Sequence, residues 1–289
     1  MKRFLLCMFL AITVSSQNLL AQDIPLIEPL SEEVAQNVLR IYEYGQLLGN
    51  QPDVFSKIGD SITESLWFFY AIGEGFYELD EQTEYLQEVI DYYSHSTAYP
   101  YNSFSNTSLA AKSGWAAGAA LNPEFSDETY CNWDEPPLIC EYRISRPSVA
   151  LILFGTNDVG YIPTEYFREN IEIIIQMSID RGVIPIISTV PYRVGHEERT
   201  QLYNEAIYEL ADEYLIPVWP YAEILYALPN YGLSTDNIHP SPPYHYKYSA
   251  NFKSEYLYSG YVLRNLSGLQ MLYEVYKVLH PETLAEKDA

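Results

Sequence analysis

The chain has 289 residues, and 39 Asp and Glu against 16 Lys and Arg give it a formal net charge of −23. This acidity excludes functions that depend on anionic partners, because the chain would repel both the phosphate backbone of nucleic acids and anionic lipid surfaces. A hydrophobic fraction of 48% with only 19% charged residues excludes a disordered chain and is typical of a globular protein. The 28 tyrosines are the compositional outlier, and such rings suit wet clefts because each has an apolar face and a polar tip.

The N-terminus has the pattern of a secretory signal peptide over residues 1–21. Lys2 and Arg3 form a positive start, Phe4–Val14 is an apolar run, and a polar, small-residue stretch leads to a cleavage site after Ala21. An uncleaved membrane anchor is the alternative, but the apolar run is shorter than the roughly 20 residues that span a bilayer. We therefore expect a secreted or periplasmic protein without stable membrane insertion.

The chain that follows the signal begins with an N-terminal helical extension, residues 22–50. Ser31 is a suitable N-cap and Gly49 a suitable stop, which predicts a helix over Ser31–Gly49. The elements predicted next are a short buried strand at Val54–Ile58, a helix at Glu81–Tyr93, a second strand at Ser105–Ala111 and a short helix at Ala116–Leu121.

Two cysteines, Cys131 and Cys140, remain once Cys7 is removed with the signal. In an exported protein an even pair in a loop predicts a disulfide, and the intervening Asn132–Ile139 is expected to be an ordered loop closed at its base. The alternative is a pair of free thiols. A metal site is disfavoured, because no further Cys or closely spaced His accompanies the pair.

From Arg146 onward, apolar runs alternate with amphipathic helical patterns. The runs predict strands that are covered on both faces. The predicted elements are strands at Val149–Phe154, Val183–Ser188 and Ile216–Trp219 and helices at Thr164–Arg181, Glu197–Tyr214, Tyr221–Leu228 and Leu257–Leu279. This alternation predicts one α/β domain over residues 51–280, with a mainly parallel sheet between helices, and a frayed tail over 281–289.

Three polar motifs lie at or near the carboxyl ends of predicted strands, where open parallel sheets bind their ligands. They are Gly59-Asp60-Ser61, Gly155-Thr156-Asn157-Asp158 and Asp236-Asn237-Ile238-His239. Together they contain a hydroxyl, an imidazole and a carboxylate, the groups needed for acyl transfer. Since Asp236 and His239 are three residues apart, one turn can place the carboxylate against one imidazole nitrogen and leave the other free for Ser61.

In this order, the motifs resemble those of the SGNH, or GDSL-type, hydrolase family. Ile58–Thr63 is similar to the nucleophile block, Gly155–Asp158 to the oxyanion block and Asp236–His239 to the D-x-x-H block, and the resemblance spans about residues 54–240. It implies a flavodoxin-like three-layer α/β/α sandwich, ester hydrolysis through a serine acyl-enzyme, and neither a metal nor an organic cofactor.

The resemblance also implies a role for each site residue. Ser61 would attack the ester carbonyl, His239 would take its proton as the base, and Asp236 would orient the imidazole. The oxyanion would be held by the N–H groups of Ser61 and Gly114 and by the side-chain amide of Asn157.

Alternatives remain for several residues. Gly118 competes with Gly114, because the family pattern is loosest at that block. Ser61 alone could be the N-cap of the next helix, which serine favours. Asp60 and Asp158 are expected to be structural, bonding to loop N–H groups beside the nucleophile and capping the following segment.

Two aromatic clusters adjoin the motifs. The segment from Tyr244 to Tyr261 follows the proposed base, and as a wall of the cleft it would stack on sugar rings or aromatic esters; the alternative is a loop packed on the domain surface. The cluster Trp67–Tyr70 follows the nucleophile and is expected to belong to the core.

We therefore expect an exported serine esterase for small or carbohydrate-linked acyl esters, with a small-molecule or glycan ester as its partner, acting as a monomer. The alternatives are lipase- or thioesterase-like activity on longer acyl chains, or a non-catalytic carbohydrate-binding module on the same fold. Nearly all the remaining acids are expected on the surface, where they bias the cleft toward uncharged esters.

Overall fold

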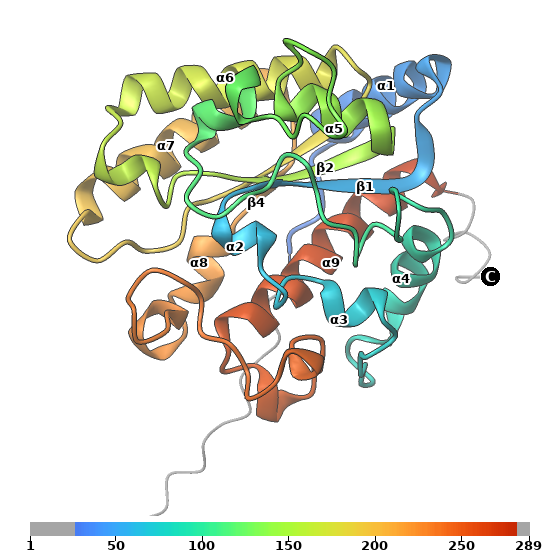
Figure 1. The fold of residues 1–289 in the computed structure, drawn as a ribbon. Helices are drawn as coiled ribbons and strands as arrows, with labels where there is room; N and C mark the ends of the chain where they lie inside the picture. Colours follow the sequence, from blue (N-terminus) through green and yellow to red (C-terminus); the bar gives the residue numbers. More distant parts are fainter. Residues whose placement is uncertain (1–26, 282–289) are drawn as a thin grey trace, which may run out of the picture.

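Four strands in the order β1-β2-β3-β4 form an all-parallel sheet in the computed structural model, which describes residues 27–281 (Figure 1). The strands are β1 (Gln51–Gly59), β2 (Pro147–Leu153), β3 (Ile184–Ser188) and β4 (Val218–Trp219). β2 and β3 are buried along their whole length, as their continuous apolar runs predicted. The predicted signal peptide and residues 22–26 and 282–289 lie outside the described residues.

Helices cover both faces of this sheet. α5 (Pro137–Ser145), α6 (Thr164–Ile179) and α7 (Glu197–Tyr214) lie on one side, and α3 (Tyr70–Gly73), α4 (Gln87–Ser94) and α9 (Gly260–Leu279) lie on the other (Figure 1). The remaining α-helices are α1 (Glu32–Leu48), which packs against α9, and the short α2 (Ser61–Glu64) and α8 (Tyr221–Leu225). The predicted three-layer α/β/α sandwich with a parallel sheet is confirmed.

Aromatic rings fill the core beside β1. Phe55 of this strand makes edge-to-face contacts with Phe69, Tyr93 and Phe104 at centroid distances of 5.7, 5.3 and 5.1 Å, and all four rings are fully buried. Each such pair adds about 0.5–1.5 kcal/mol to the free energy gained by burial. The cluster therefore holds two segments against β1: the one that follows α2 and the loop that contains Phe104.

The prediction of a strand at Ser105–Ala111 is wrong. The chain does run along the free edge of β1, but the backbone pairing is a single bridge at Gly59, whose N–H donates to the Ala110 carbonyl at 3.0 Å. Farther along this edge, a side chain takes the place of the ladder, because Ser103 Oγ accepts the N–H of Phe55 at 2.9 Å. With the edge groups satisfied in this way, no regular strand forms.

The prediction of a loop between the two cysteines is also partly wrong. Cys131 and Cys140 form the predicted disulfide, with 5.3 Å between their Cα atoms, but Cys140 lies inside α5. Pro137 begins this helix, because proline is tolerated in a first turn whose N–H has no helical partner. The disulfide therefore ties a loop to a helix.

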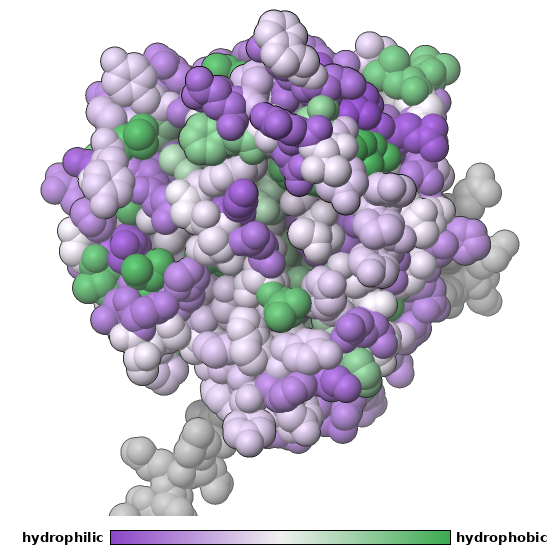
Figure 2. Space-filling view, viewed as in Figure 1, coloured by the Kyte–Doolittle hydropathy of each residue, from purple (hydrophilic) through white to green (hydrophobic). Residues whose placement is uncertain are grey.

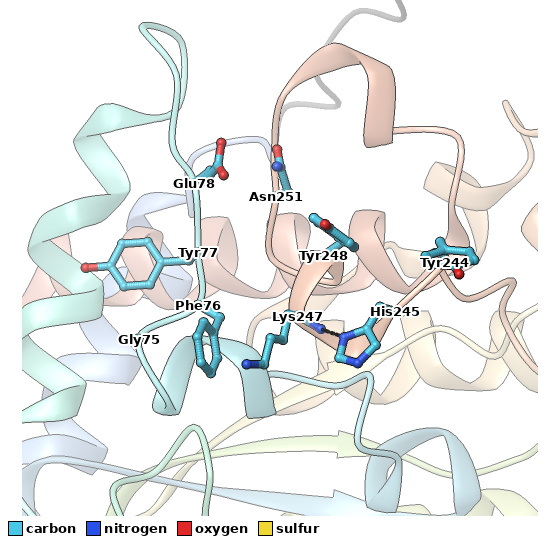
Figure 3. A pocket seen from close by; sticks show the side chains of 9 residues that line it. All are labelled: Gly75, Phe76, Tyr77, Glu78, Tyr244, His245, Lys247, Tyr248 and Asn251. Atoms are coloured by element: carbon cyan, nitrogen blue, oxygen red, sulfur yellow. Dashed lines mark hydrogen bonds between the residues drawn. The ribbon is translucent and has the colours of Figure 1, made fainter.

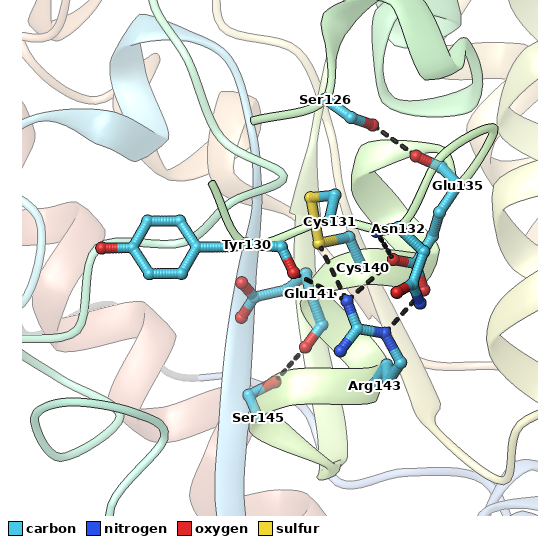
Figure 4. A network of polar contacts seen from close by, with 9 residues as sticks. All are labelled: Ser126, Tyr130, Cys131, Asn132, Glu135, Cys140, Glu141, Arg143 and Ser145. Carbon is cyan, nitrogen blue, oxygen red and sulfur yellow. Dashed lines mark hydrogen bonds and ion pairs between the residues drawn. A yellow bond between two sulfur atoms is a disulfide. The ribbon is translucent and has the colours of Figure 1, made fainter. Parts of the chain in front are cut away.

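Arg143 of α5 reinforces the same connection. Its Nε donates to Glu135 Oε1 at 2.8 Å and its Nη2 to the Tyr130 carbonyl at 2.9 Å (Figure 4). The same Nη2 lies 3.7 Å from Cys140 Sγ. The disulfide and this ion pair together hold the acidic loop against the helix layer.

Most acids lie outside the interior. Among the described residues, the buried acids are Asp53, Asp60, Glu141, Asp158 and Glu274. The face shown in Figure 2 is mostly purple or pale, with small, separated green groups. Within residues 27–281 we find no helix that is both long and apolar enough to cross a bilayer.

Candidate active site

Ser61 is the first residue of α2, directly after the tight turn from β1. Gly59 ends the strand, and a Cβ there would lie 2.4 Å from the Leu153 carbonyl oxygen, so only glycine fits. Asp60 is the N-cap of α2, with its Oδ1 accepting the N–H of Ile62 at 2.9 Å. Because Asp60 occupies the cap, the alternative of Ser61 as N-cap is wrong, and the Ser61 hydroxyl is available to another side chain.

Ser61, His239 and Asp236 form one hydrogen-bonded chain. Ser61 Oγ lies 2.8 Å from His239 Nε2, and His239 Nδ1 lies 2.7 Å from Asp236 Oδ2. The loop that holds the last two residues is closed by the Ser234 N–H, which donates to the His239 carbonyl at 2.8 Å. The carboxylate therefore binds one ring nitrogen and the serine hydroxyl binds the other.

The carboxylate of Asp236 receives more donors than the imidazole alone. Its Oδ1 accepts from Ser234 Oγ at 2.7 Å and from the N–H groups of Ile238 and His239 at 2.9 and 3.0 Å. Burial raises the pKa of this carboxyl, but the hydrogen bonds from Ser234, His239 and Ile238 outweigh burial and hold the pKa well below its usual range. Asp236 is therefore ionised at neutral pH, which favours the imidazole tautomer with its proton on Nδ1.

Two further carboxyls are buried near the nucleophile turn. Burial raises the pKa of Asp60 to about 6, although the hydrogen bond from the Ile62 N–H lowers it. Burial likewise raises the pKa of Asp158 to about 6, against the bonds from Ala117 N to its Oδ1 at 2.9 Å and from Gly155 N to its Oδ2 at 3.1 Å. The Asp158 bonds join the turn after β2 to the loop at Ala117.

Arg264 of α9 is a buried cation that sequence reasoning missed. Its guanidinium lies 4.2 Å from the centroid of Phe68 and 4.8 Å from that of Trp219, and its Nη2 donates to Thr63 Oγ1 at 3.2 Å. Thr63 belongs to α2, so the arginine supports the helix that begins at Ser61. Its positive charge also lowers the pKa of Asp60, partly offsetting the effect of burial.

Asn157 lies in the segment after β2, and its side chain bonds to the loop that contains Gly114. Asn157 Nδ2 donates to the Trp115 carbonyl at 2.9 Å, which uses one of the two amide N–H groups. Gly114, the residue before Trp115, has φ +83°, a conformation that favours glycine. Ser113 in turn donates its N–H to Glu64 Oε2 at 2.7 Å, and this contact joins the segment to the end of α2.

The two glycines considered for the oxyanion site lie in different surroundings. Gly114 is exposed and adjoins α2 through its neighbour Ser113. Gly118 belongs to the 3₁₀-helix Ala117–Leu121, where an added Cβ would lie 3.4 Å from Asn170 of α6. Gly114 is thus the glycine on the nucleophile's side of this loop.

Ser61, Asp236 and His239 line an open cavity of about 480 Å³. Its other lining residues are Glu64, Ser65, Trp67, Ser113, Ser234, Pro240, Pro242 and Tyr261. Gly114 and Asn157 are not part of this lining and connect to it through Ser113 and Trp115. The sequence reasoning missed Glu64, Ser65, Ser113 and Ser234; only Ser234, a short polar residue two positions before Asp236, carried a local signal for its role.

The aromatic cluster after the nucleophile divides between core and cavity. Phe68 and Phe69 are fully buried, as predicted. Trp67 is half-buried: it packs against the core and also lines the cavity, so its assignment to the core is only partly right. The chain changes direction after α2, so successive rings face different surroundings. A helix or strand periodicity in the sequence does not predict this.

The later aromatic segment divides as well. Tyr261 lines the cavity, but Tyr244 and Tyr248 line a second groove of about 660 Å³ (Figure 3). The interpretation of the segment as one wall of the catalytic cleft is therefore wrong, except for Tyr261.

Among residues 27–281, one cluster of side chains has the spacing of metal ligands: Cys131, Glu135 and Cys140. Its two sulfurs are bonded to each other in the disulfide. Zinc binds the free thiolate, so this cluster does not fit a metal ion.

The sequence matches the GDSL-like lipase/acylhydrolase family over residues 58–246, well over half of the chain. Similar solved structures include a lipase/acylhydrolase from Enterococcus faecalis (19% identity, 74% of this chain and 95% of that one, TM-score 0.44) and an acetylxylan esterase from Geobacillus stearothermophilus (16%, 75% and 93%, 0.44). A GDSL-like lipase from Bacteroides thetaiotaomicron is also similar (16%, 75% and 93%, 0.42). No curated protein matches the chain. The chain belongs to the GDSL-like lipase/acylhydrolase family and is a serine hydrolase that acts on ester bonds.

Proposed function

We propose that this protein is an exported serine esterase that hydrolyses small or carbohydrate-linked acyl esters. The observation that supports it best is the hydrogen-bonded chain from Ser61 through His239 to Asp236, at 2.8 and 2.7 Å. It lies at the carboxyl end of β1 and opens to solvent through the cavity of about 480 Å³. A hydroxyl, a base and an orienting carboxylate in this order suit nucleophilic acyl transfer.

The reaction proceeds through an acyl-enzyme. Ser61 Oγ attacks the ester carbonyl carbon while His239 Nε2 accepts its proton, and Asp236 stabilises the imidazolium. The N–H groups of Ser61 and Gly114 and the second amide N–H of Asn157 hold the tetrahedral oxyanion, where one such donor contributes roughly 3–4 kcal/mol. The alcohol leaves with the proton from His239, and a water molecule then releases the acid by the same steps.

The walls of the cavity favour a short or polar acyl ester. None of the lining residues is Leu, Ile, Val, Met or Phe, and the apolar surface comes from two prolines, Trp67 and Tyr261. A long acyl chain needs a continuous aliphatic surface to leave water, since the gain is proportional to apolar area. The carboxylates of Glu64 and Asp236 at the same cavity disfavour anionic esters.

Export is supported by the signal pattern in residues 1–21 and by the Cys131–Cys140 disulfide, since such bonds persist in oxidising compartments. Residues 51–280 form the hydrolase domain in this proposal. The helix of the 22–50 extension packs against α9 and on the sheet beside it.

A fluorophosphonate probe and a panel of 4-nitrophenyl esters, from acetate to palmitate, test the proposal. Wild type should be labelled and should turn over the short esters fastest. Ser61→Ala should lose both properties, and Ser254→Ala, which changes an exposed serine, should keep them. Equal labelling of Ser61→Ala would refute the nucleophile, and a rate maximum at palmitate would favour lipase-like activity instead.

A further inference from the structure

A second groove, of about 660 Å³, lies beside the catalytic cavity, and the ester chemistry makes no use of it. Residues 75–78 form one wall, and the loop from Tyr244 to Asn251 forms the other (Figure 3). Pro242 lines the catalytic cavity and Tyr244 lines the groove. Two residues of extended chain span at most about 7 Å, so the two linings approach each other closely at this point of the chain.

Hydrogen bonds join the two walls of the groove. The Glu78 N–H donates to the Ala250 carbonyl at 3.0 Å, and the Phe252 N–H donates to the Glu78 carbonyl at 3.0 Å. Beside the groove, the Tyr246 hydroxyl donates to Glu74 Oε2 at 2.9 Å. These bonds join segments about 170 residues apart in sequence. A preformed site binds a ligand more tightly, because less conformational freedom is lost on binding.

Exposed rings stand on both walls. Tyr244 is 94% exposed, Tyr248 41% and Phe76 39%. Tyr244 and Phe76 stand on opposite sides, with Lys247 and Tyr248 between them (Figure 3). Within the described part of the chain, the Tyr244 side chain makes no hydrogen bond and no ring contact, so its apolar faces are open to a ligand.

Polar groups lie among these rings. Lys247 Nζ is 3.7 Å from the centroid of Phe76, and His245 and Asn251 line the same groove. Asn251 Oδ1 accepts the N–H of Lys253 at 3.2 Å, which leaves its amide NH₂ for a ligand. The side chain of Glu78 is paired with Lys253, so its charge is compensated.

This combination matches the two surfaces of a pyranose ring. The ring's C–H faces pack on aromatic faces, and its hydroxyl edges exchange hydrogen bonds with amide, imidazole and ammonium groups. An alkyl chain would cover the rings but would offer no hydrogen-bond partner to Lys247 Nζ, His245 Nε2 and Asn251 Nδ2, which costs free energy. The net charge of −23 disfavours an anionic polysaccharide.

We propose that the groove of Phe76 and Tyr244 is a subsite for a neutral sugar residue, next to the acylated residue of an oligosaccharide whose ester lies at Ser61. The choice of an acylated glycan rests on the proposed function. Sugar binding in the groove does not depend on turnover, so the two are tested separately.

Calorimetric titration of the Ser61→Ala protein with xylohexaose, cellohexaose and chitohexaose tests the subsite, because this variant should not turn over any ester. We expect at least one hexasaccharide to bind. Tyr244→Ala in the same background should weaken that binding about five- to tenfold, the loss of one stacked ring, whereas Tyr244→Phe should retain it. Tyr44→Ala, a matched change of an exposed tyrosine on α1, should have no effect.

Kinetics of the otherwise unmodified enzyme provide a second readout. On the acetylated form of the hexasaccharide that binds, Tyr244→Ala should raise KM about five- to tenfold and leave kcat unchanged. If no hexasaccharide binds, or if Tyr244→Ala binds as tightly as its parent, the subsite is refuted while short-ester hydrolysis can still stand. If a hexasaccharide binds through Tyr244 but no ester is hydrolysed, the esterase proposal fails and the subsite stands.

Discussion

Replacing Asp236 with asparagine tests the proposal that this carboxylate orients the His239 imidazole for catalysis. Three donors converge on Oδ1 of Asp236: Ser234 Oγ and the N–H groups of Ile238 and His239, at 2.7, 2.9 and 3.0 Å. Oδ2 faces only His239 Nδ1, at 2.7 Å. In the Asp236→Asn variant, the amide oxygen must therefore occupy the Oδ1 position, and the NH₂ group faces the imidazole.

That orientation traps the histidine in the wrong tautomer. An NH₂ group donates, so Nδ1 of His239 must accept and the ring proton moves to Nε2, which can then no longer take the proton from Ser61. Rotating the amide would restore the reactive tautomer but would turn its NH₂ against the N–H groups of Ile238 and His239, at a cost of about 1.5 kcal/mol for each hydrogen bond lost. The Ser234 hydroxyl can turn to accept from the NH₂ group, so its bond is kept. A cost of about 3 kcal/mol leaves less than one molecule in 100 reactive. The lost carboxylate charge adds to this, and we expect kcat to fall about 10⁴-fold.

The assay is kcat on 4-nitrophenyl acetate together with the rate of fluorophosphonate labelling, with circular dichroism to confirm folding. Ser234→Ala alone should lower kcat by less than about fivefold, because it removes one neutral hydrogen bond. If Asp236→Asn keeps more than a tenth of the wild-type kcat, the role of this carboxylate is refuted.

Two further substitutions test the surroundings of the nucleophile. Asn157→Ala should lower kcat on 4-nitrophenyl acetate about 10²- to 10³-fold through loss of an oxyanion donor, and a loss below tenfold would remove Asn157 from the oxyanion site. Asp60→Asn should flatten the pH dependence of stability, measured by urea unfolding from pH 4 to 7 with tryptophan fluorescence. The pKa of Asp60 is raised from 3.8 to about 6 in the folded protein, which therefore holds this proton more tightly than the unfolded chain and loses about 3 kcal/mol as pH rises from 4 through 6. Parallel stability profiles for the variant and wild type would contradict this value.

The parallel sheet and its helices could be predicted because their signals are local. An apolar run such as Val183–Ser188 corresponds to a strand buried on both faces, and Glu197–Tyr214 has the bounds of α7. Such patterns depend on the periods of strand and helix, which act over a few residues. The polar motifs that end or follow the strands were visible for the same reason.

The errors arose where distant residues decide the local conformation. Ser105–Ala111 has the composition of a strand, but the hydroxyl of Ser103 and a single bridge at Gly59 satisfy the edge of β1 instead. The cysteine pair predicts a loop over Asn132–Ile139, yet Pro137 starts α5 within it. The buried Arg264 gave no signal, since an arginine in a helix is usually exposed.

By itself, the sequence determined the α/β class, the order of the strands along the chain and the short motifs that contain Ser61, Asn157 and the Asp236–His239 pair. These features depend on neighbouring residues and on backbone periods. Only the tertiary structure decided that Ser61 and His239, 178 residues apart, lie 2.8 Å from each other. It also placed Trp67 at the catalytic cavity and Tyr244 in a separate groove. The physical reason is that the exposure of a loop side chain depends on which distant segment packs against it, and no local pattern encodes that partner.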